Sequence, residues 1–334
     1  MKAIVLNQNT YKFEIKEVKQ PDISSACVLV KLKASAINHH ELWSLQEKEI
    51  KSNEDIILGS DGSGLIKEVG AHVNDFKKGD EVVINPSLNW GSDAQVQAEN
   101  YQILGYPTQG TFAEYIALDH KYIEHKPKNL SFQEAAAVPL AGLTAYRALF
   151  TQGKIKVNQK VLITGIGGGV ALFVLTFAIA MGAEVYVTSG DDNKIAKAIA
   201  LGTKAGANYK GHSWKKELID QANGFDIIID SAAGPDFAGL TELAKPGGRI
   251  VLFGRTAGNI SNLDPKTIFW KQLSIQGTTM GNAQEFKDMM NFISSKNISP
   301  VIDSIYSPYE INSAYNRMYE SNQFGKMVID WENF

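Results

Sequence analysis

The chain has 334 residues, which is enough for two domains of ordinary size. Its hydrophobic content of 44% and charged content of 21% are typical of a globular protein, and its net charge of −3 gives no reason to expect nucleic acid or an acidic membrane as a partner. The single cysteine, Cys27, excludes an internal disulfide bond and a zinc site built from several cysteines. Because a strand pattern starts at Lys2 and no apolar signal segment follows, we expect a cytoplasmic location.

Residues 2–125 are predicted to form a β-rich domain. Short runs of apolar and β-branched residues are separated by turn positions such as Gly70-Ala71 and Gly79-Asp80. This pattern favours a compact, barrel-like antiparallel domain. The predicted strands are Lys2–Leu6, Phe13–Val18, Val28–Ala34, Gly64–Val69, Glu81–Ile84 and Phe112–Leu118.

The pattern becomes helical from Ser131, which forms a capping box with Glu134 and so predicts a helix start. A second helical pattern covers Leu140–Phe150. Strands and helices then alternate from Lys160 to Gly277, and the strands are continuous apolar runs of the kind found in parallel sheets covered on both faces. The later strands are Asp226–Asp230, Arg249–Phe253 and Leu273–Gly277, and the chain closes with helices over Ala283–Ser295 and Tyr309–Ser321 and a strand over Lys326–Trp331.

A glycine cluster stands at the start of the alternating region. Val161–Thr164 predicts a strand, Gly165–Gly169 a tight turn, and Ala171–Met181 a buried helix, with a second strand over Glu184–Thr188. Glycines there permit positive φ and let a ligand approach bare backbone, while the helix start attracts a pyrophosphate. The match to G-x-G-x-x-G is partial, because Val170 stands where the third glycine would fall.

Two other interpretations of the glycine cluster remain open. It is compatible with a glycine-rich turn that binds no ligand. The apolar run from Gly167 to Ala183 also invites a membrane span, but at about 17 residues it is shorter than the roughly 20 that a bilayer requires. We therefore predict a dinucleotide-binding βαβ unit whose backbone contacts come from Gly165, Gly167, Gly168, Gly169 and Val170.

The sequence resembles the medium-chain dehydrogenase/reductase superfamily, and within it the zinc-free quinone-oxidoreductase-like branch. The resemblance covers essentially the whole chain. It implies a GroES-like catalytic domain at residues 1–125, completed by 283–334, a Rossmann domain at 126–282, and an active site in the cleft between them. The stretches that carry it are Ala34–Leu42, Leu58–Gly64, Phe76–Val82, Val138–Tyr146 and the glycine turn.

The chain departs from its zinc-dependent relatives at the metal positions. The resemblance implies that Asn38, Ser60 and Leu140 stand where those relatives place a Cys, a His and a Cys. None of the three replaces such a ligand well. The lobe over 85–110, which in relatives holds a structural zinc, contains no cysteine here. The adjacent His39 and His40 point apart on a strand or loop, and no third ligand is at hand, so we expect no metal.

The end of the second Rossmann strand indicates the cofactor. NAD-binding proteins usually place an acid there, whereas this strand ends in Thr188-Ser189-Gly190, with Lys194 close behind. The resemblance adds Tyr209 as the partner of that lysine in NADPH-using relatives. Asp191 and Asp192 weigh against this interpretation, and a solvated turn with a surface lysine is the alternative. We predict NADP(H).

Further cofactor contacts are expected at the carboxyl ends of the parallel strands, where ligands of such sheets lie. The resemblance adds Thr144, which relatives place near the cofactor. The expected contact residues are Thr144, Ser189, Gly190, Lys194, Tyr209, Ser231, Ala232, Phe253, Gly254 and Thr278.

Without a metal, the hydride acceptor must already be electrophilic, as quinones and conjugated enones or enals are. Asn38 is the candidate donor to the acceptor oxygen. The resemblance places His40 at the proton-relay position of zinc relatives, although a structural histidine or a proton from water are alternatives. Asn89, Trp90 and Tyr106 either line the acceptor pocket or pack within their own loop.

The predicted function is therefore zinc-independent, NADPH-dependent reduction of a quinone or conjugated carbonyl. An enoyl-thioester reductase of the acrylyl-CoA type is the alternative within enzymes. A non-catalytic NADPH-binding redox sensor or structural protein is the alternative outside them. The resemblance of Leu273–Gly277 to a strand that pairs between subunits predicts a homodimer, and the only other expected partner is a small-molecule acceptor.

Overall fold

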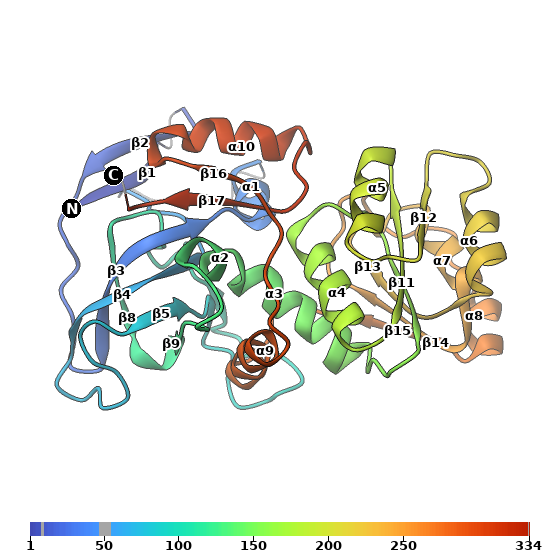
Figure 1. Ribbon diagram of the computed structural model, residues 1–334, viewed down its shortest axis with the longest axis horizontal. Coiled ribbons are helices and arrows are strands. Elements are labelled where there is room, and N and C mark those ends of the chain that lie inside the picture. The colour runs from blue at the N-terminus through green and yellow to red at the C-terminus, as the bar shows by residue number, and fades with distance from the viewer. Residues whose placement is uncertain (8–9, 47–54, 333) are drawn as a thin grey trace. The chain divides into compact units, whose positions relative to one another are not determined.

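A computed structural model describes residues 1–7, 10–46, 55–332 and 334 of the chain (Figure 1). It consists of two compact units, one formed by Met1–Leu143 with Gly281–Phe334 and the other by Thr144–Met280. The first unit thus continues past residue 125, where we expected the domains to divide. The reason is helix α2 (Phe132–Ala137), which packs on strands of the first unit.

A seven-stranded sheet forms the centre of the first unit, in the order β16-β17-β3-β4-β5-β9 with β8 paired to β3. The sheet is mixed rather than wholly antiparallel, because β16 and β17 run parallel and are connected through helix α10. The strands of this sheet are β3 (Cys27–Ala36), β4 (Asp61–Val69), β5 (Glu81–Ile84), β8 (Tyr115–Asp119), β9 (Ile123–His125), β16 (Ile302–Tyr306) and β17 (Lys326–Asp330).

Shorter elements complete the first unit. A hairpin of β1 and β2 lies beside α10 (Figure 1). The antiparallel pair of β6 and β7 lies in the lobe over 85–110, for which the resemblance implied a structural zinc ion in relatives. These elements are β1 (Lys2–Asn7), β2 (Lys12–Glu17), α1 (His39–Gln46), β6 (Ser87–Leu88), β7 (Gln102–Ile103), a 3₁₀ turn at His120–Tyr122, α3 (Pro139–Tyr146, which runs on into the second unit), α9 (Ala283–Ser295), a 3₁₀ turn at Pro308–Glu310 and α10 (Ile311–Tyr319).

Strand β3 is buried on both faces at its C-terminal end, residues 34–36, where the main core of the unit lies on one side of the sheet and α2 on the other. Small side chains at this second contact let the helix come close to the sheet. The helix begins at Ser131 with the predicted capping box to Glu134. The residues of the second contact are Ala34, Ala36, Ala136, Ala137 and Val328.

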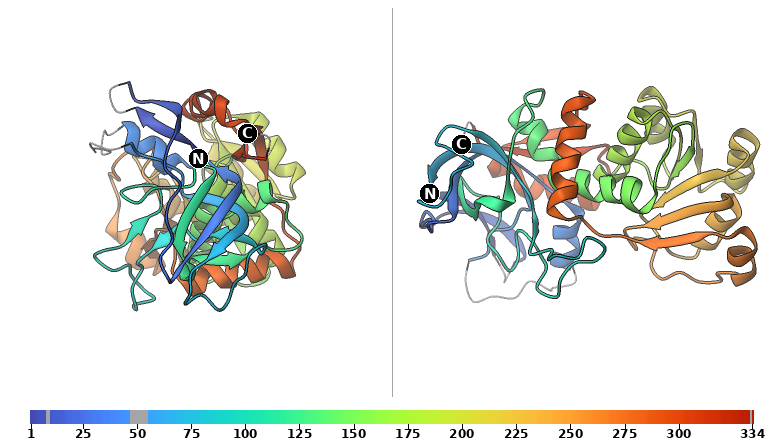
Figure 2. Two further views of the ribbon diagram at one scale, coloured as in Figure 1. Left: turned by 90° about the vertical axis from the view of Figure 1, so that its left-hand side faces the viewer. Right: turned by 90° about the horizontal axis from the view of Figure 1, so that it is seen from below.

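The second unit is a six-stranded parallel sheet in the order β12-β11-β10-β13-β14-β15. Helices cover both faces, as the view from below in Figure 2 shows. This confirms the predicted doubly wound α/β class. Its elements are a π-helical turn at Arg147–Gln152, β10 (Lys160–Ile163), α4 (Gly169–Ala180), β11 (Glu184–Ser189), α5 (Asp192–Ala200), β12 (Ala205–Asn208), α6 (Trp214–Ala222), β13 (Phe225–Asp230), α7 (Phe237–Leu243), β14 (Ala244–Leu252), α8 (Pro265–Lys271) and β15 (Ser274–Gly277).

Helix α4 is the apolar segment that invited a membrane interpretation. It has 12 residues and packs against β10 and β11. In the part of the chain that the structure describes, no helix has the length and apolarity that a membrane crossing requires. The burial of Leu172, Val174, Leu175 and Phe177 within the unit accounts for the apolar run.

Candidate active site

The glycine turn joins β10 to α4 with backbone conformations that glycine favours. Gly165 has φ +65° and Gly167 has φ +131°. Gly168 caps α4 without a side chain, and a β-carbon built on it would meet nothing within 4 Å. Since the first N–H groups of a helix have no partner within the helix, the turn presents donors to open space. Gly169 and Val170 are the first residues of α4, so the predicted phosphate-binding turn forms as one local unit.

Side chains with phosphate-binding chemistry gather at the end of β11. Tyr209 follows β12, whose pairing with β11 brings Tyr209 N to Ser189 O at 3.1 Å. A β-carbon built on Gly190 would lie 2.7 Å from Tyr209 Oη and 2.9 Å from Lys210 Cε, so both side chains lie directly against the Gly190 backbone. Lys210 is a basic residue that sequence reasoning missed, although it directly follows Tyr209.

Lys194 belongs to the same group. A β-carbon on Gly167 would lie 3.0 Å from Lys194 Cδ and 3.4 Å from its Nζ, so the lysine lies over the glycine turn. The two nearby acids have structural partners: Asp191 caps α5 by accepting from Asn193 N at 2.9 Å, and Asp192 accepts from Asn208 Nδ2 at 2.9 Å.

The other expected cofactor residues lie at the carboxyl ends of the remaining strands, as predicted. Ser231 and Ala232 follow β13, while Phe253 and Gly254 follow β14. A β-carbon on Gly254 would lie 2.5 Å from Ser231 O, so this close approach requires glycine. The loops that follow β13 and β14 therefore lie directly against each other at Ser231 and Gly254.

Thr144 and Thr278 are the last two of the expected cofactor residues. Thr144 Oγ1 donates to Met280 Sδ at 3.6 Å. Thr278 Oγ1, just after β15, is buried and finds no partner among the described residues. An orphaned hydroxyl of this kind, together with the open glycine turn, fits a bound dinucleotide.

In the first unit, Asn38 is buried and held at both ends of its amide. Its Oδ1 accepts from Lys326 Nζ at 2.5 Å, and its Nδ2 donates to Asp61 Oδ2 at 3.0 Å. Lys326 and Asp61 form an ion pair at 3.0 Å, with side chains 4% and 0% exposed. A lysine only donates and an ionised carboxylate only accepts, so these neighbours fix which way the Asn38 amide faces.

The donors of this cluster are almost fully used. Lys326 Nζ donates to Ile37 O as well as to Asn38 and Asp61, which accounts for its three protons. Asp61 Oδ1 accepts from Leu140 N at 2.8 Å. The hydrogen bonds of the cluster described above leave the second Nδ2–H of Asn38 as a remaining donor, so Asn38 is the group able to bind an acceptor oxygen.

Glu41 connects the same segments from the other side. Its carboxylate accepts from Asn38 N at 2.8 Å, Ser60 N at 3.1 Å and Tyr315 Oη at 3.0 Å. Burial raises the pKa of Glu41 to about 7, and the neighbouring Asn38 N–H and Lys326 oppose that rise. Two carboxylates, Asp61 and Glu41, therefore join the segments around residues 38, 60 and 140.

These residues do not fit the zinc ion of zinc-dependent relatives. Ser60 Oγ is engaged with Leu104 O at 2.7 Å, and Leu140 offers no ligand atom in its side chain. The ammonium group of Lys326 on Asn38 Oδ1 would also repel a divalent cation. Among the described residues, no cluster of three or more His, Cys, Asp or Glu side chains has the arrangement of a metal site.

His40 is the second residue of α1. Burial lowers its pKa to about 4, against a smaller opposing effect of Asp61. The imidazole is therefore neutral near pH 7, and its charged form is too rare there to act as a strong acid. The neighbouring His39 bonds to Gln323 through its Nε2 at 3.2 Å.

The expected acceptor-pocket residues are tied into their own lobe. Asn89 has φ +57° and exchanges hydrogen bonds with the Tyr122 hydroxyl. Trp90 donates to Asp93 O at 2.9 Å and packs edge-to-face on Tyr101. Tyr106 packs against the main core of the first unit. These bonds describe loop packing, and a role in acceptor binding stays a prediction.

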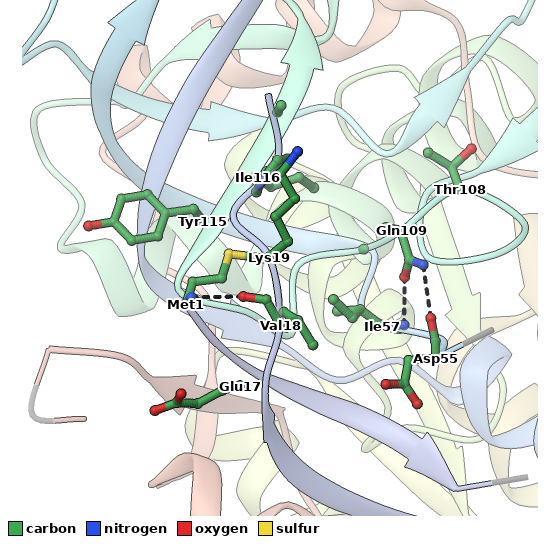
Figure 3. A pocket seen from close by; sticks show the side chains of 13 residues that line it. Met1, Glu17, Val18, Lys19, Asp55, Ile57, Thr108, Gln109, Tyr115 and Ile116 are labelled. Atoms are coloured by element: carbon green, nitrogen blue, oxygen red, sulfur yellow. Dashed lines mark hydrogen bonds between the residues drawn. The ribbon is translucent and has the colours of Figure 1, made fainter. Parts of the chain in front are cut away.

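A cavity of about 570 Å³ lies elsewhere in the first unit, between the N-terminal hairpin and β8 (Figure 3). Several of its polar groups already have partners: the amino group of Met1 donates to Val18 O, and Gln109 bridges Ile57 N and Asp55 O. None of the expected site residues lines this cavity.

Two family models match separate parts of the chain. The model of the alcohol dehydrogenase GroES-like domain matches residues 24–128, and that of the zinc-binding dehydrogenase family matches residues 169–295. The chain is 33% identical over 340 residues to the zinc-type alcohol dehydrogenase-like protein YogA of Leptosphaeria maculans, covering 96% of this chain and 95% of that protein.

Two further relatives extend the comparison. Acryloyl-coenzyme A reductase of Sulfurisphaera tokodaii is 28% identical over 341 residues, which cover 98% of this chain and 99% of that enzyme. The crystal structure of an NAD-dependent alcohol dehydrogenase superposes with a TM-score of 0.91 at 32% identity and covers 99% of each chain. These relatives share the whole two-unit architecture and confirm the predicted fold class.

The opposite pKa shifts of neighbouring residues on α1 predict opposite effects of pH on stability. In a His40→Asn variant, the free energy of unfolding should fall relative to wild type as pH rises from 4 to 6.5, because the variant lacks the stability that wild type gains over this range as the unfolded chain alone releases the His40 proton. In a Glu41→Gln variant it should rise relative to wild type as pH rises from 4.5 to 7, because the variant lacks the stability that wild type loses over this range as folded Glu41 keeps a proton that the unfolded chain releases. Each effect amounts to up to ~3 kcal/mol.

Urea unfolding of both variants and wild type across this pH range measures these slopes. Subtracting the wild-type curve removes the contribution of other groups, such as Asp303, whose pKa is lowered to about 2. Slopes of the same sign in the two variants would contradict the assignment.

Proposed function

This chain belongs to the medium-chain dehydrogenase/reductase superfamily, and we propose that within it the chain reduces a quinone or conjugated carbonyl with NADPH and without a catalytic zinc ion. The observation that carries the proposal is the cluster at Asn38, where Lys326 and Asp61 occupy the surroundings in which zinc relatives bind metal. An acceptor that is already electrophilic needs no Lewis acid.

Bound nicotinamide supplies the hydride. The protein's part is to stabilise the negative charge that develops on the acceptor oxygen, and the remaining Nδ2–H of Asn38 is the donor that we assign to this task. All three N–H groups of the Lys326 ammonium donate hydrogen bonds within the cluster, and His40 is neutral near pH 7. The product oxyanion therefore takes its proton from water.

A thioester acceptor is the second candidate. It is favoured by the similarity to acryloyl-coenzyme A reductase over nearly the full length of both chains. An enoyl thioester is also a conjugated carbonyl, so the same hydride transfer and the same Asn38 donor apply to it. A matched enal and enoyl-CoA with the same carbon chain separate the candidates by their kcat/KM values.

NADPH is proposed over NADH because basic and hydroxyl groups, rather than an acid, lie at the end of β11. The Lys194 side chain lies over the glycine turn at Gly167. Tyr209 Oη and the Lys210 side chain lie close to the Gly190 backbone. Together they supply the charge that a 2′-phosphate requires.

We expect Asn38→Ala to lower kcat about 100-fold with a conjugated enal or quinone, because one oxyanion donor is lost. The assay follows NADPH oxidation by absorbance with a chelator present. The matched control is Asn74→Ala, an exposed asparagine that should leave kcat unchanged. Wild-type turnover that the chelator abolishes, or no turnover with any of these acceptors, would refute the proposed function.

Lys194→Ala and Lys210→Ala should each raise the Kd of NADPH about tenfold or more and that of NADH less than twofold, since each removes a charge-assisted bond to the 2′-phosphate. Titration calorimetry with both nucleotides measures this. Lys197→Ala, on the same helix as Lys194, is the control. Equal effects on NADPH and NADH would remove the 2′-phosphate role.

We also propose a homodimer formed through the edge strand β15, the last in its sheet. Phe269 and Trp270 on the preceding helix α8 are 64% and 78% exposed, which is unusual for large apolar side chains. Light scattering should give twice the chain mass of 36.6 kDa. Trp270→Ser should weaken the dimer, whereas Tyr319→Ser, at a similarly exposed aromatic, should not; a monomeric wild type would contradict the proposal.

A further inference from the structure

The strongest unexplained feature of the first unit is the buried ion pair of Asp61 and Lys326. Burying two charges costs much of what their attraction returns, and such a pair is weak evidence for stability by itself. Here every proton of the ammonium group has an acceptor, and one of those acceptors is the Asn38 amide oxygen. The pair therefore acts on Asn38 directly.

We infer that Asp61 and Lys326 are positioning residues that hold the Asn38 amide in one orientation and strengthen its remaining N–H as a donor. This inference rests on the proposed function. It assigns to an ion pair the two tasks that a zinc ion performs in zinc relatives: joining the segments and polarising the acceptor.

The orientation follows from donor and acceptor chemistry. If the Asn38 amide turned over, its NH₂ group would face the Lys326 ammonium and its oxygen would face the Asp61 carboxylate. Both contacts would then be repulsive, at present distances of 2.5 and 3.0 Å. The pair thus keeps the second Nδ2–H pointing the same way at all times, without a reorganisation cost during the reaction.

The strengthening follows from polarisation. A cation on the oxygen of an amide draws electron density from its nitrogen, and hydrogen bonds in series reinforce one another in a buried site. Lys326 Nζ lies on Asn38 Oδ1, and both side chains are nearly inaccessible to solvent. The effect is larger for the charged transition state than for the neutral acceptor, so it acts on kcat more than on KM.

The fold brings this pair to Asn38 from distant parts of the chain. Lys326 begins β17, which pairs antiparallel with β3 in the register Val328 to Ala36, and Ile37 N donates to Met327 O. Asp61 begins β4, the other neighbour of β3. Asn38 follows β3 directly, so two strand pairings set the positions of both charges.

The first test compares Lys326→Met with Lys326→Arg. Lys326→Met should lower kcat at least tenfold with KM changed less than twofold, and Lys326→Arg, which keeps the charge, should restore kcat to within about threefold. The control is Lys126→Met. The Lys126 side chain is also only 6% exposed, and it bonds to Glu81, Leu130 O and Pro127 O. None of these bonds involves Asn38. Lys126→Met should lower the melting temperature and leave kcat unchanged.

A double variant guards against misfolding caused by an unpaired buried charge. Asp61→Asn with Lys326→Met leaves no charge, and the new asparagine oxygen can still accept from Leu140 N. Its NH₂ group would donate to the Asn38 oxygen, so the Asn38 amide is expected to turn over and kcat to stay at least tenfold low. Unchanged kcat in a folded Lys326→Met or double variant would overturn the inference, as would an equal loss of kcat in Lys126→Met.

A readout without turnover separates this inference from the proposed function. Side-chain amide signals of ¹⁵N-asparagine-labelled protein, assigned with Asn38→Ala, report hydrogen exchange at Asn38. Exchange should be slow in wild type and Lys126→Met and at least tenfold faster in Lys326→Met. Equal exchange in all three would overturn the inference, whereas slow wild-type exchange with no turnover on any acceptor would overturn only the proposed function.

Discussion

The ion pair of Asp61 and Lys326 is the interaction on which the first unit's candidate site depends. It lies where three strands and the start of α3 meet, and its partners are side-chain and backbone groups of those segments. Its charges are costly to bury, and that cost is offset because each has several hydrogen-bonding partners. The same bonds leave a defined donor at Asn38, so stability and chemistry have a common origin here.

The second unit depends on a different constraint, the shape of the glycine turn. Positive φ at Gly165 and Gly167 lets the chain pass from β10 to α4 with backbone donors facing outward. At Gly190 the side chains of Tyr209 and Lys210 come close to the backbone, and at Gly254 the backbone of Ser231 does. A sheet of parallel strands places the carboxyl ends of its strands on one edge, which is why the residues that we propose for the nucleotide site come from distant parts of the sequence.

Local signals in the sequence predicted most elements, including the capping box at Ser131, the glycine turn and the long central strands. Strands β6, β7 and β9 escaped prediction because they are only two or three residues long. Strands β12 and β16 also escaped it, because Ala205–Asn208 has little β-forming character and Ile302–Tyr306 gains its place from pairing with β17. The chain division at residue 125 was placed too early, because α2 has an ordinary helical pattern and only its packing assigns it to the first unit.

By itself, the sequence determined the class of fold, and the resemblance predicted that Asn38, Ser60 and Leu140 stand at zinc-ligand positions, because both depend on residue types at given positions. It also pointed to Asn38 as a donor. Tertiary structure alone decided that Lys326 lies on Asn38 Oδ1 across 288 residues, and that Asp61 lies on its Nδ2. Strand pairing is non-local, so no local pattern records which charge will lie beside which amide.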